Sequence, residues 1–182
     1  MKTLIAYHGD VAVKKKYLDR MKAHRKADNL IKGTGWENGK GCAVGCTLEK
    51  YEHKAYENEL GIPRYLAQIE DAIFEGLPKA EAMLWPEQFL GAIKPGADLS
   101  LVFPRFMAWM LSDPNDGVIH FADERGKKAI RGVVDLFLKW TKTGKDGGYS
   151  ARAAAENTAR AAARAAAYRR MAEKLIELLE SA

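Results

Sequence analysis

The chain has 182 residues, of which 47% are hydrophobic and 29% are charged, a balance typical of a folded protein with one substantial core. Its apolar runs are too short to cross a membrane, and its first residues lack the pattern of a secretory signal. We therefore expect a cytoplasmic protein without a membrane partner.

Residues 2–8 are compatible with a short strand, and a helix is expected over residues 11–31. The apolar face of this helix carries, at helical spacing, Val13, Tyr17, Met21, His24 and Ile31. Residues 1–40 hold ten Lys and Arg against four Asp and Glu, whereas the other residues hold nineteen against twenty. Lys15, Lys22 and Lys26 lie opposite the apolar face and are candidate binding residues.

Residues 33–45 are rich in glycine and are expected to form a loop that contains Trp36. Both cysteines, Cys42 and Cys46, lie in the segment 39–47, GKGCAVGCT. Small residues allow close approach of backbone to a ligand, a partner or another part of the chain. Trp36, Lys40 and Cys46 are therefore candidate contact residues of this segment.

Further helices are expected after this loop. One carries Leu48 and Leu60, with His53 on it, and a second spans 63–75. The others cover 79–84, 86–93, about 98–111 and 129–140. The stretch 113–117, DPNDG, predicts a turn, and residues 118–121 are either extended or the start of a helix.

From residue 151 onward, apolar residues alternate at steps of three and four, first alanines and then leucines. This pattern predicts a long helix whose alanine seam allows close packing. We expect it to pack on a core formed by residues 1–148, with residues 149–182 in contact with that core or with a second copy.

The cysteine segment is the candidate site for chemistry. Cys42 near a helix N-terminus is a possible nucleophile, and His120 is a possible base brought to it by folding. His53 is expected two turns along the same helix as Cys46, too far away to act. The spacing C-x-x-x-C is not that of thioredoxin-like enzymes, and C-x₃-C-x₆-H matches no zinc pattern. No metal and no cofactor are therefore expected, and both thiols can also be simple packing groups.

Three segments together resemble uncharacterised proteins of bacteriophage and bacterial genomes. They are GKGCAVGCT at 39–47, YENELGIP at 56–63 and EDAIFEGLP at 70–78, and the Ala/Arg-rich C-terminal helix is similar as well. The resemblance implies a phage or prophage context, in which small proteins that bind a host factor are common. It implies no activity.

The sequence thus predicts an all-α, single-domain helical bundle of about six helices with a long alanine-rich C-terminal helix. We expect a non-enzymatic protein-interaction protein whose partner is another protein or a second copy. One alternative is a cysteine-dependent hydrolase or transferase that uses Cys42. A second alternative is nucleic-acid binding through the basic 14–26 helix.

Overall fold

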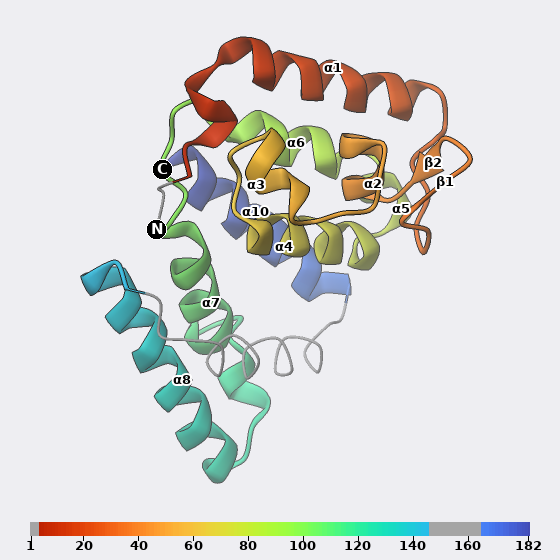
Figure 1. Ribbon diagram of the computed structural model, residues 1–182. Helices are drawn as coiled ribbons and strands as arrows, with labels where there is room; N and C mark the ends of the chain where they lie inside the picture. The colour runs from red at the N-terminus through yellow and green to blue at the C-terminus, as the bar shows by residue number, and fades with distance from the viewer. Residues whose placement is uncertain (1–3, 146–164) are drawn as a thin grey trace. The chain divides into compact units, whose positions relative to one another are not determined.

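The computed structural model of the protein describes residues 4–145 and 165–182 (Figure 1). Within these ranges it contains nine α-helices, two 3-10 helices and one two-stranded sheet. The all-α expectation is confirmed, with more and shorter helices than expected. The chain divides into two compact units, residues 1–100 with 179–182, and residues 101–178. The expected division at residue 148 falls outside the described ranges and stays a prediction.

The first unit is a set of mostly short helices with one β-hairpin. Its elements are η1 (Ala6–Gly9), α1 (Val11–Lys26), β1 (Trp36–Glu37), β2 (Lys40–Gly41), α2 (Ala43–Leu48), α3 (Ala55–Glu59), α4 (Arg64–Gly76), α5 (Lys79–Ala82) and α6 (Trp85–Ala92). Helix α1 packs against α6 and α2, and α2 packs against α4. In Figure 1 the hairpin lies beside the C-terminal end of α1.

Helix α1 begins after Asp10, whose Oδ1 accepts a hydrogen bond from the Ala12 amide at 2.7 Å. The expected apolar face is confirmed at Tyr17 and Met21, which are buried, whereas Val13 and His24 are half-buried. The helix ends at Lys26 instead of continuing to residue 31. Asp28 adopts a left-handed conformation (φ 52°), which an α-helix does not accept.

Helix α4 agrees with the helix expected over 63–75, and Pro63 directly precedes it. Its buried face carries the apolar residues Leu66, Ala67, Ile73 and Phe74. The same face also carries two buried carboxyl groups, those of Glu70 and Asp71. The short helices α5 and α6 confirm the two pieces expected on either side of Trp85.

The single helix expected between Leu48 and Leu60 is wrong. Helix α2 starts at Ala43, with Cys42 at its N-cap, and ends at Leu48 because Glu49 takes a left-handed conformation (φ 56°). Helix α3 begins only at Ala55. Residues 49–54 therefore leave the helix axis, and this break places His53 differently from the prediction.

The short strand considered over residues 2–8 is absent from its described part. Tyr7 and His8 are left-handed (φ 52° and 53°) within η1, a conformation that costs energy for residues other than glycine. The surrounding structure compensates, since the buried Tyr7 hydroxyl donates to the Leu90 carbonyl oxygen at 2.7 Å. The Ala6 amide also donates to the Ala97 carbonyl oxygen, at 3.0 Å.

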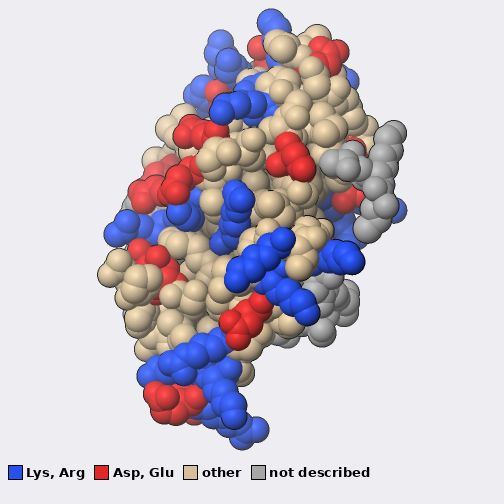
Figure 2. Space-filling view, turned by 90° about the vertical axis from the view of Figure 1, so that its left-hand side faces the viewer, with Lys and Arg blue, Asp and Glu red and all other residues tan. Residues whose placement is uncertain are grey.

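The second unit is built on an α-helical hairpin of α7 (Val102–Ser112) and α8 (Glu124–Thr143), with η2 (Val118–Phe121) between them. The turn expected at 113–117 is confirmed, because Asp113 Oδ1 accepts from the amides of Asn115 and Asp116. Phe103, Phe137 and Trp140 form an aromatic cluster, with ring centroids 5.8–6.4 Å apart. Lys and Arg side chains gather along the outward face of α8, with acidic side chains among them (Figure 2).

Helix α10 (Ala165–Glu180) confirms the helical expectation for the last part of the chain, and the alanine seam before residue 165 lies outside the described residues. Leu175 and Leu179 of the expected leucine seam are both fully buried. Self-association through this helix stays a prediction. Across the described ranges, no helix is both long enough and apolar enough to span a bilayer.

Candidate functional site

The cysteine segment follows a tight β-hairpin. Trp36 pairs with Gly41 and Glu37 with Lys40, and the two turn residues, Asn38 and Gly39, have φ values of 50° and 77°. Two successive positive φ angles are typical of a type I′ turn, which Asn-Gly favours. The Asn-Gly pair was a usable signal in the sequence, but the segment had been predicted to be a loop without strands.

The glycines of this segment allow backbone to meet backbone. A Cβ atom at either Gly41 or Gly45 would collide with the carbonyl oxygen of Gly35. The Gly41 amide donates to the Asn29 carbonyl oxygen at 3.0 Å, and the Ile31 amide donates to the Gly41 carbonyl oxygen at 2.9 Å. The expectation of a close-approach segment is confirmed, and the neighbour is another part of the same chain.

Both thiols lie inside this packing. Cys42 and Cys46 are free and buried, and their Sγ atoms donate to the carbonyl oxygens of Gly35 (3.6 Å) and Gly41 (3.4 Å). Burial raises the pKa of Cys42 well above its ordinary value, and the adjacent Asp71 carboxylate raises it further. Burial also raises the pKa of Cys46, to about 12. Both groups are therefore protonated thiols at neutral pH.

The two adjacent acids of α4, Glu70 and Asp71, are buried, whereas acidic residues are almost never buried unless they are paired. Glu70 is fully buried, and its Oε2 accepts from the Tyr56 hydroxyl at 2.7 Å. Burial raises the pKa of Glu70 well above its ordinary value, and although the Tyr56 hydrogen bond lowers it, the nearby Asp71 raises it further. Burial therefore favours the neutral form of Glu70 in the folded protein.

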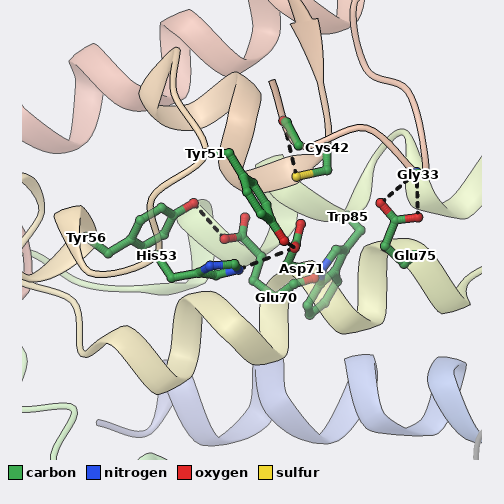
Figure 3. Close-up of polar contacts among 10 residues, drawn as sticks. Gly33, Cys42, Tyr51, His53, Tyr56, Glu70, Asp71, Glu75 and Trp85 are labelled. Atoms are coloured by element: carbon green, nitrogen blue, oxygen red, sulfur yellow. Dashed lines mark hydrogen bonds and ion pairs between the residues drawn. The ribbon is translucent and has the colours of Figure 1, made fainter. Parts of the chain in front are cut away.

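Asp71 is the centre of a second cluster (Figure 3). Its Oδ2 accepts from the Tyr51 hydroxyl at 3.1 Å and lies 3.3 Å from His53 Nε2. Burial by itself would raise the pKa of Asp71, but His53, together with Cys42 and Tyr51, holds the pKa below its ordinary value. Asp71 is thus a carboxylate at neutral pH, one residue away from a carboxyl group whose burial favours the neutral form.

His53 reaches this cluster because α2 and α3 are separate helices. The imidazole is 21% exposed, and its ring centroid lies 5.0 Å from that of Tyr51 in an edge-on arrangement. The prediction that His53 lies two turns along the helix of Cys46 is wrong. No glycine or proline directly beside Glu49 in the sequence predicts the end of α2 there. The geometry places Asp71 beside both Cys42 and His53. A cysteine nucleophile instead needs the imidazole next to its thiol.

Polar contacts of the same kind tie α4 to the neighbouring segments (Figure 3). The Gly33 amide donates to both carboxylate oxygens of Glu75, at 3.0 and 3.1 Å. The indole Nε1 of Trp85 donates to the backbone carbonyl oxygen of Glu70 at 3.0 Å. Helix α4 therefore holds the loop before the hairpin, the loop after α2, and the start of α6.

Of the candidate contact residues near the cysteines, two reach the surface. Trp36 is half-buried and meets the edge of His24 at a centroid distance of 5.4 Å, and Lys40 is exposed. Cys46 is fully buried and is therefore not placed to contact a partner in this conformation. Tyr51 was not a candidate, although it is 54% exposed and its ring lies against the backbone of Gly35.

His120, the base considered for Cys42, belongs to η2 in the second unit. Its Nε2 lies 3.0 Å from the carbonyl oxygen of Asp113, within that unit. The polar side chains found beside Cys42 come from the first unit. The pairing of Cys42 with His120 stays a prediction.

The candidate lysines of α1 are all exposed, and Lys15 forms an ion pair with Asp19. Their basic neighbours serve the fold. Lys14 Nζ donates to the carbonyl oxygens of Gly91 and Ile93, both at 2.6 Å, and Arg20 donates to that of Thr47 at 3.0 Å.

Arg25 of α1 forms an ion pair with Glu87 of α6. Together with Lys14 and Arg20, it belongs to the cations of the 14–26 segment that bind other parts of the chain. Three of the cations on α1 therefore bind carbonyl or carboxylate oxygens within the first unit.

Within the described ranges, no group of three or more His, Cys, Asp or Glu side chains is arranged to hold a metal ion. Comparison with known proteins adds no family: no family model matches the chain, and neither a curated protein nor a solved structure is significantly similar to it.

Proposed function

We propose that the protein is a non-enzymatic binding protein that contacts a protein partner through the Tyr51 surface, defined here as Trp36, Lys40 and Tyr51. The observation that carries the proposal is that the Tyr51 side chain is exposed and yet held in a fixed position. Its side chain is 54% exposed, yet its hydroxyl is fixed on Asp71 and its ring rests on Gly35. A large aromatic side chain that is both exposed and held in place loses little entropy on binding.

The chemistry of the cysteine segment also favours binding over catalysis. Both thiols are buried and protonated, whereas the attacking species in cysteine catalysis is the thiolate. The polar contacts of Asp71, Glu70 and Glu75 join segments of the chain. Their effect is to hold the hairpin and the loop with Tyr51 in fixed positions. The resemblance to phage and bacterial proteins supports a host factor as the partner.

A photo-crosslinking amino acid at position 51, introduced into the full chain in its native host cells, tests the proposal. Position 84 is the matched control, because Leu84 is 47% exposed in the same unit. We expect a defined protein adduct from position 51 that position 84 does not give. No protein adduct from position 51, or the same adducts from both positions, would contradict the proposal.

Once the partner is identified, its affinity for variants sharpens the test. Truncation of an aromatic anchor costs about 2 kcal/mol or more, roughly a 30-fold loss of affinity, and we expect this for Tyr51→Ala. Tyr51→Phe keeps the ring but loses the bond to Asp71, so a smaller loss is expected. Equal affinity of Tyr51→Ala and the unaltered protein would show that the surface lies elsewhere.

The alternative of a cysteine-dependent enzyme rests on the polar cluster beside Cys42, and alkylation tests it. With iodoacetamide, we expect no modification of either thiol in the native protein between about pH 6 and 8, since raised pKa values and burial both oppose reaction. Rapid alkylation of Cys42 within that range would favour the enzyme. A Cys42→Ser variant identifies which thiol reacts.

A further inference from the structure

The second unit contains a concentration of positive charge that the whole-chain balance conceals. Residues 124–145 hold seven Lys and Arg against two acids, a net charge of +5, whereas residues 41–123 hold six against thirteen. In the net charge of all residues after 40, the positive charge of residues 124–145 is therefore cancelled by the acidic residues of 41–123. Helix α8 accounts for nearly all of these residues.

The cations of α8 face outward. Its apolar side, with Ile130, Val134, Phe137 and Trp140, is buried. The side chains on the opposite side include five exposed cations, Arg125, Lys128, Arg131, Lys139 and Lys142. Among the described residues these five form no ion pair, in contrast to Lys127, which pairs with Glu124 at 2.8 Å. They span 17 helical steps, or about 25 Å at ~1.5 Å per residue.

Helix α1 is the appropriate comparison, because it was the expected nucleic-acid helix. On α1, Lys14, Arg20 and Arg25 bind backbone or carboxylate groups of the same chain, and Lys15 pairs with Asp19. On α8, among the described residues, Lys127 has such a pair and the five exposed cations have none, against three exposed lysines without an ion pair on α1, Lys16, Lys22 and Lys26. A cation without an ion pair inside the protein gains more from binding an external anion than a cation that already has one.

The composition of this face distinguishes among anionic partners. A helix that lies in a membrane surface buries its apolar side in lipid, but the apolar side of α8 is already buried in the protein. Protein interfaces are depleted in lysine at their centres. The exposed side of α8 carries these five cations against two acids, Glu124 and Asp135, although Leu136 and Leu138 are also exposed on this helix. Such an excess of positive charge along one helix fits a partner that repeats negative charge at short intervals. Nucleic acid has this property.

We propose that the outward face of α8 binds the phosphate backbone of double-stranded nucleic acid without sequence preference. Lys128, Arg131 and Lys139 are its central contacts, and Arg125 and Lys142 extend it towards the ends of the helix. The interaction is one of charge with charge, so its strength depends steeply on salt. It is independent of the Tyr51 surface, and either proposal can fail alone.

The test is fluorescence anisotropy with the full chain and a labelled DNA duplex of about 20 base pairs, titrated over several salt concentrations. The variant Lys128→Gln, Arg131→Gln, Lys139→Gln removes three central cations. Its matched control, Lys15→Gln, Lys16→Gln, Lys22→Gln on α1, removes the same charge from exposed residues of the other basic helix. Circular dichroism verifies that both variants fold.

Each phosphate contact contributes about −0.9 to the slope of log K against log salt, so the α8 variant should lose roughly 3 units of slope. We expect its affinity at low salt to fall at least about tenfold, while the α1 variant keeps both slope and affinity. Equal losses in the two variants would mean that only overall charge matters and would overturn the proposal. So would binding to vesicles rich in phosphatidylserine without binding to the duplex.

Discussion

The two units of this protein are stabilised in different ways. The first is made of short helices whose loops are fixed by buried polar groups, with Glu70 and Asp71 on α4 and glycines that let backbone touch backbone. The second relies on an aromatic cluster between α7 and α8, and its charged groups lie outside. The comparison shows that charged residues in one chain can be structural in one region and exposed to solvent in another.

The largest effect is expected from Phe137→Ala, which empties the centre of the aromatic cluster. Loss of a buried phenylalanine costs about 3–5 kcal/mol. We expect the second unit to unfold in mild denaturant while Cys42 and Cys46, which report on the first unit, stay protected from a thiol reagent. Leu138→Ala, at a position 43% exposed, is the control and should change little. Simultaneous exposure of the thiols would show that the units unfold together.

Gly45→Ala probes the backbone contact of the first unit. The added methyl group collides with the Gly35 carbonyl oxygen, and overpacking of this kind costs about 1–3 kcal/mol. Gly91→Ala is the matched control, because a Cβ there meets nothing within 4 Å and α6 should gain up to about 1 kcal/mol of helix propensity. Chemical denaturation measures both. A stable Gly45→Ala variant would contradict the close contact.

Asp71→Asn tests the buried carboxylate at the centre of the second cluster. The loss of charge-assisted hydrogen bonds should destabilise the protein by about 1–3 kcal/mol at neutral pH. The folded-state pKa of Asp71 lies below the unfolded one. Its contribution is therefore present above about pH 4 and is lost as the pH falls through the folded pKa. The difference between variant and unaltered protein should disappear in acid, and Asp135→Asn on the surface of α8 should show no such trend.

Glu70→Gln should change the stability least, and it should stabilise the protein at neutral pH, whereas Asp71→Asn destabilises it. The folded-state pKa of Glu70 is raised, so its contribution to stability is full below about pH 4 and falls as the pH rises towards the folded pKa. Glutamine imitates the neutral acid and keeps an acceptor for Tyr56. We expect a higher melting temperature than the unaltered protein at pH 7 and none of this gain at pH 4. Glu52→Gln, exposed in the same unit, should be neutral at both.

The helices with regular apolar spacing were predictable from the sequence. The spacing of apolar residues located α4 to within a residue at each end, and it located α8, although this helix begins at Glu124, five residues before the expected start. The break at Glu49 was not predictable, because a left-handed glutamate is imposed by tertiary contacts and not by its own preference. The hairpin at Asn38 and Gly39 was predictable in principle, since the turn pair is a known signal.

The candidate site was harder to predict than the fold. A single sequence does not tell a buried acid from a solvated one, so Glu70 and Asp71 were not among the candidate residues. The position of Tyr51 depends on the break at Glu49, which was not predicted. The basic face of α8 was not apparent because the charge was summed over all residues after 40. The spacing of residues within one helix does not predict burial or contacts that depend on segments far away in the sequence.

The left-handed turn at Tyr7 and His8 has a consequence for the order in which the protein folds. The groups that hold this turn, at Leu60, Leu90 and Ala97, are far along the chain. During synthesis on the ribosome, residues 6–9 emerge early, but the last of their hydrogen-bond partners is made only when residue 97 has been added. Folding of the first unit is therefore completed late and through contacts of long sequence separation, which are slow to form.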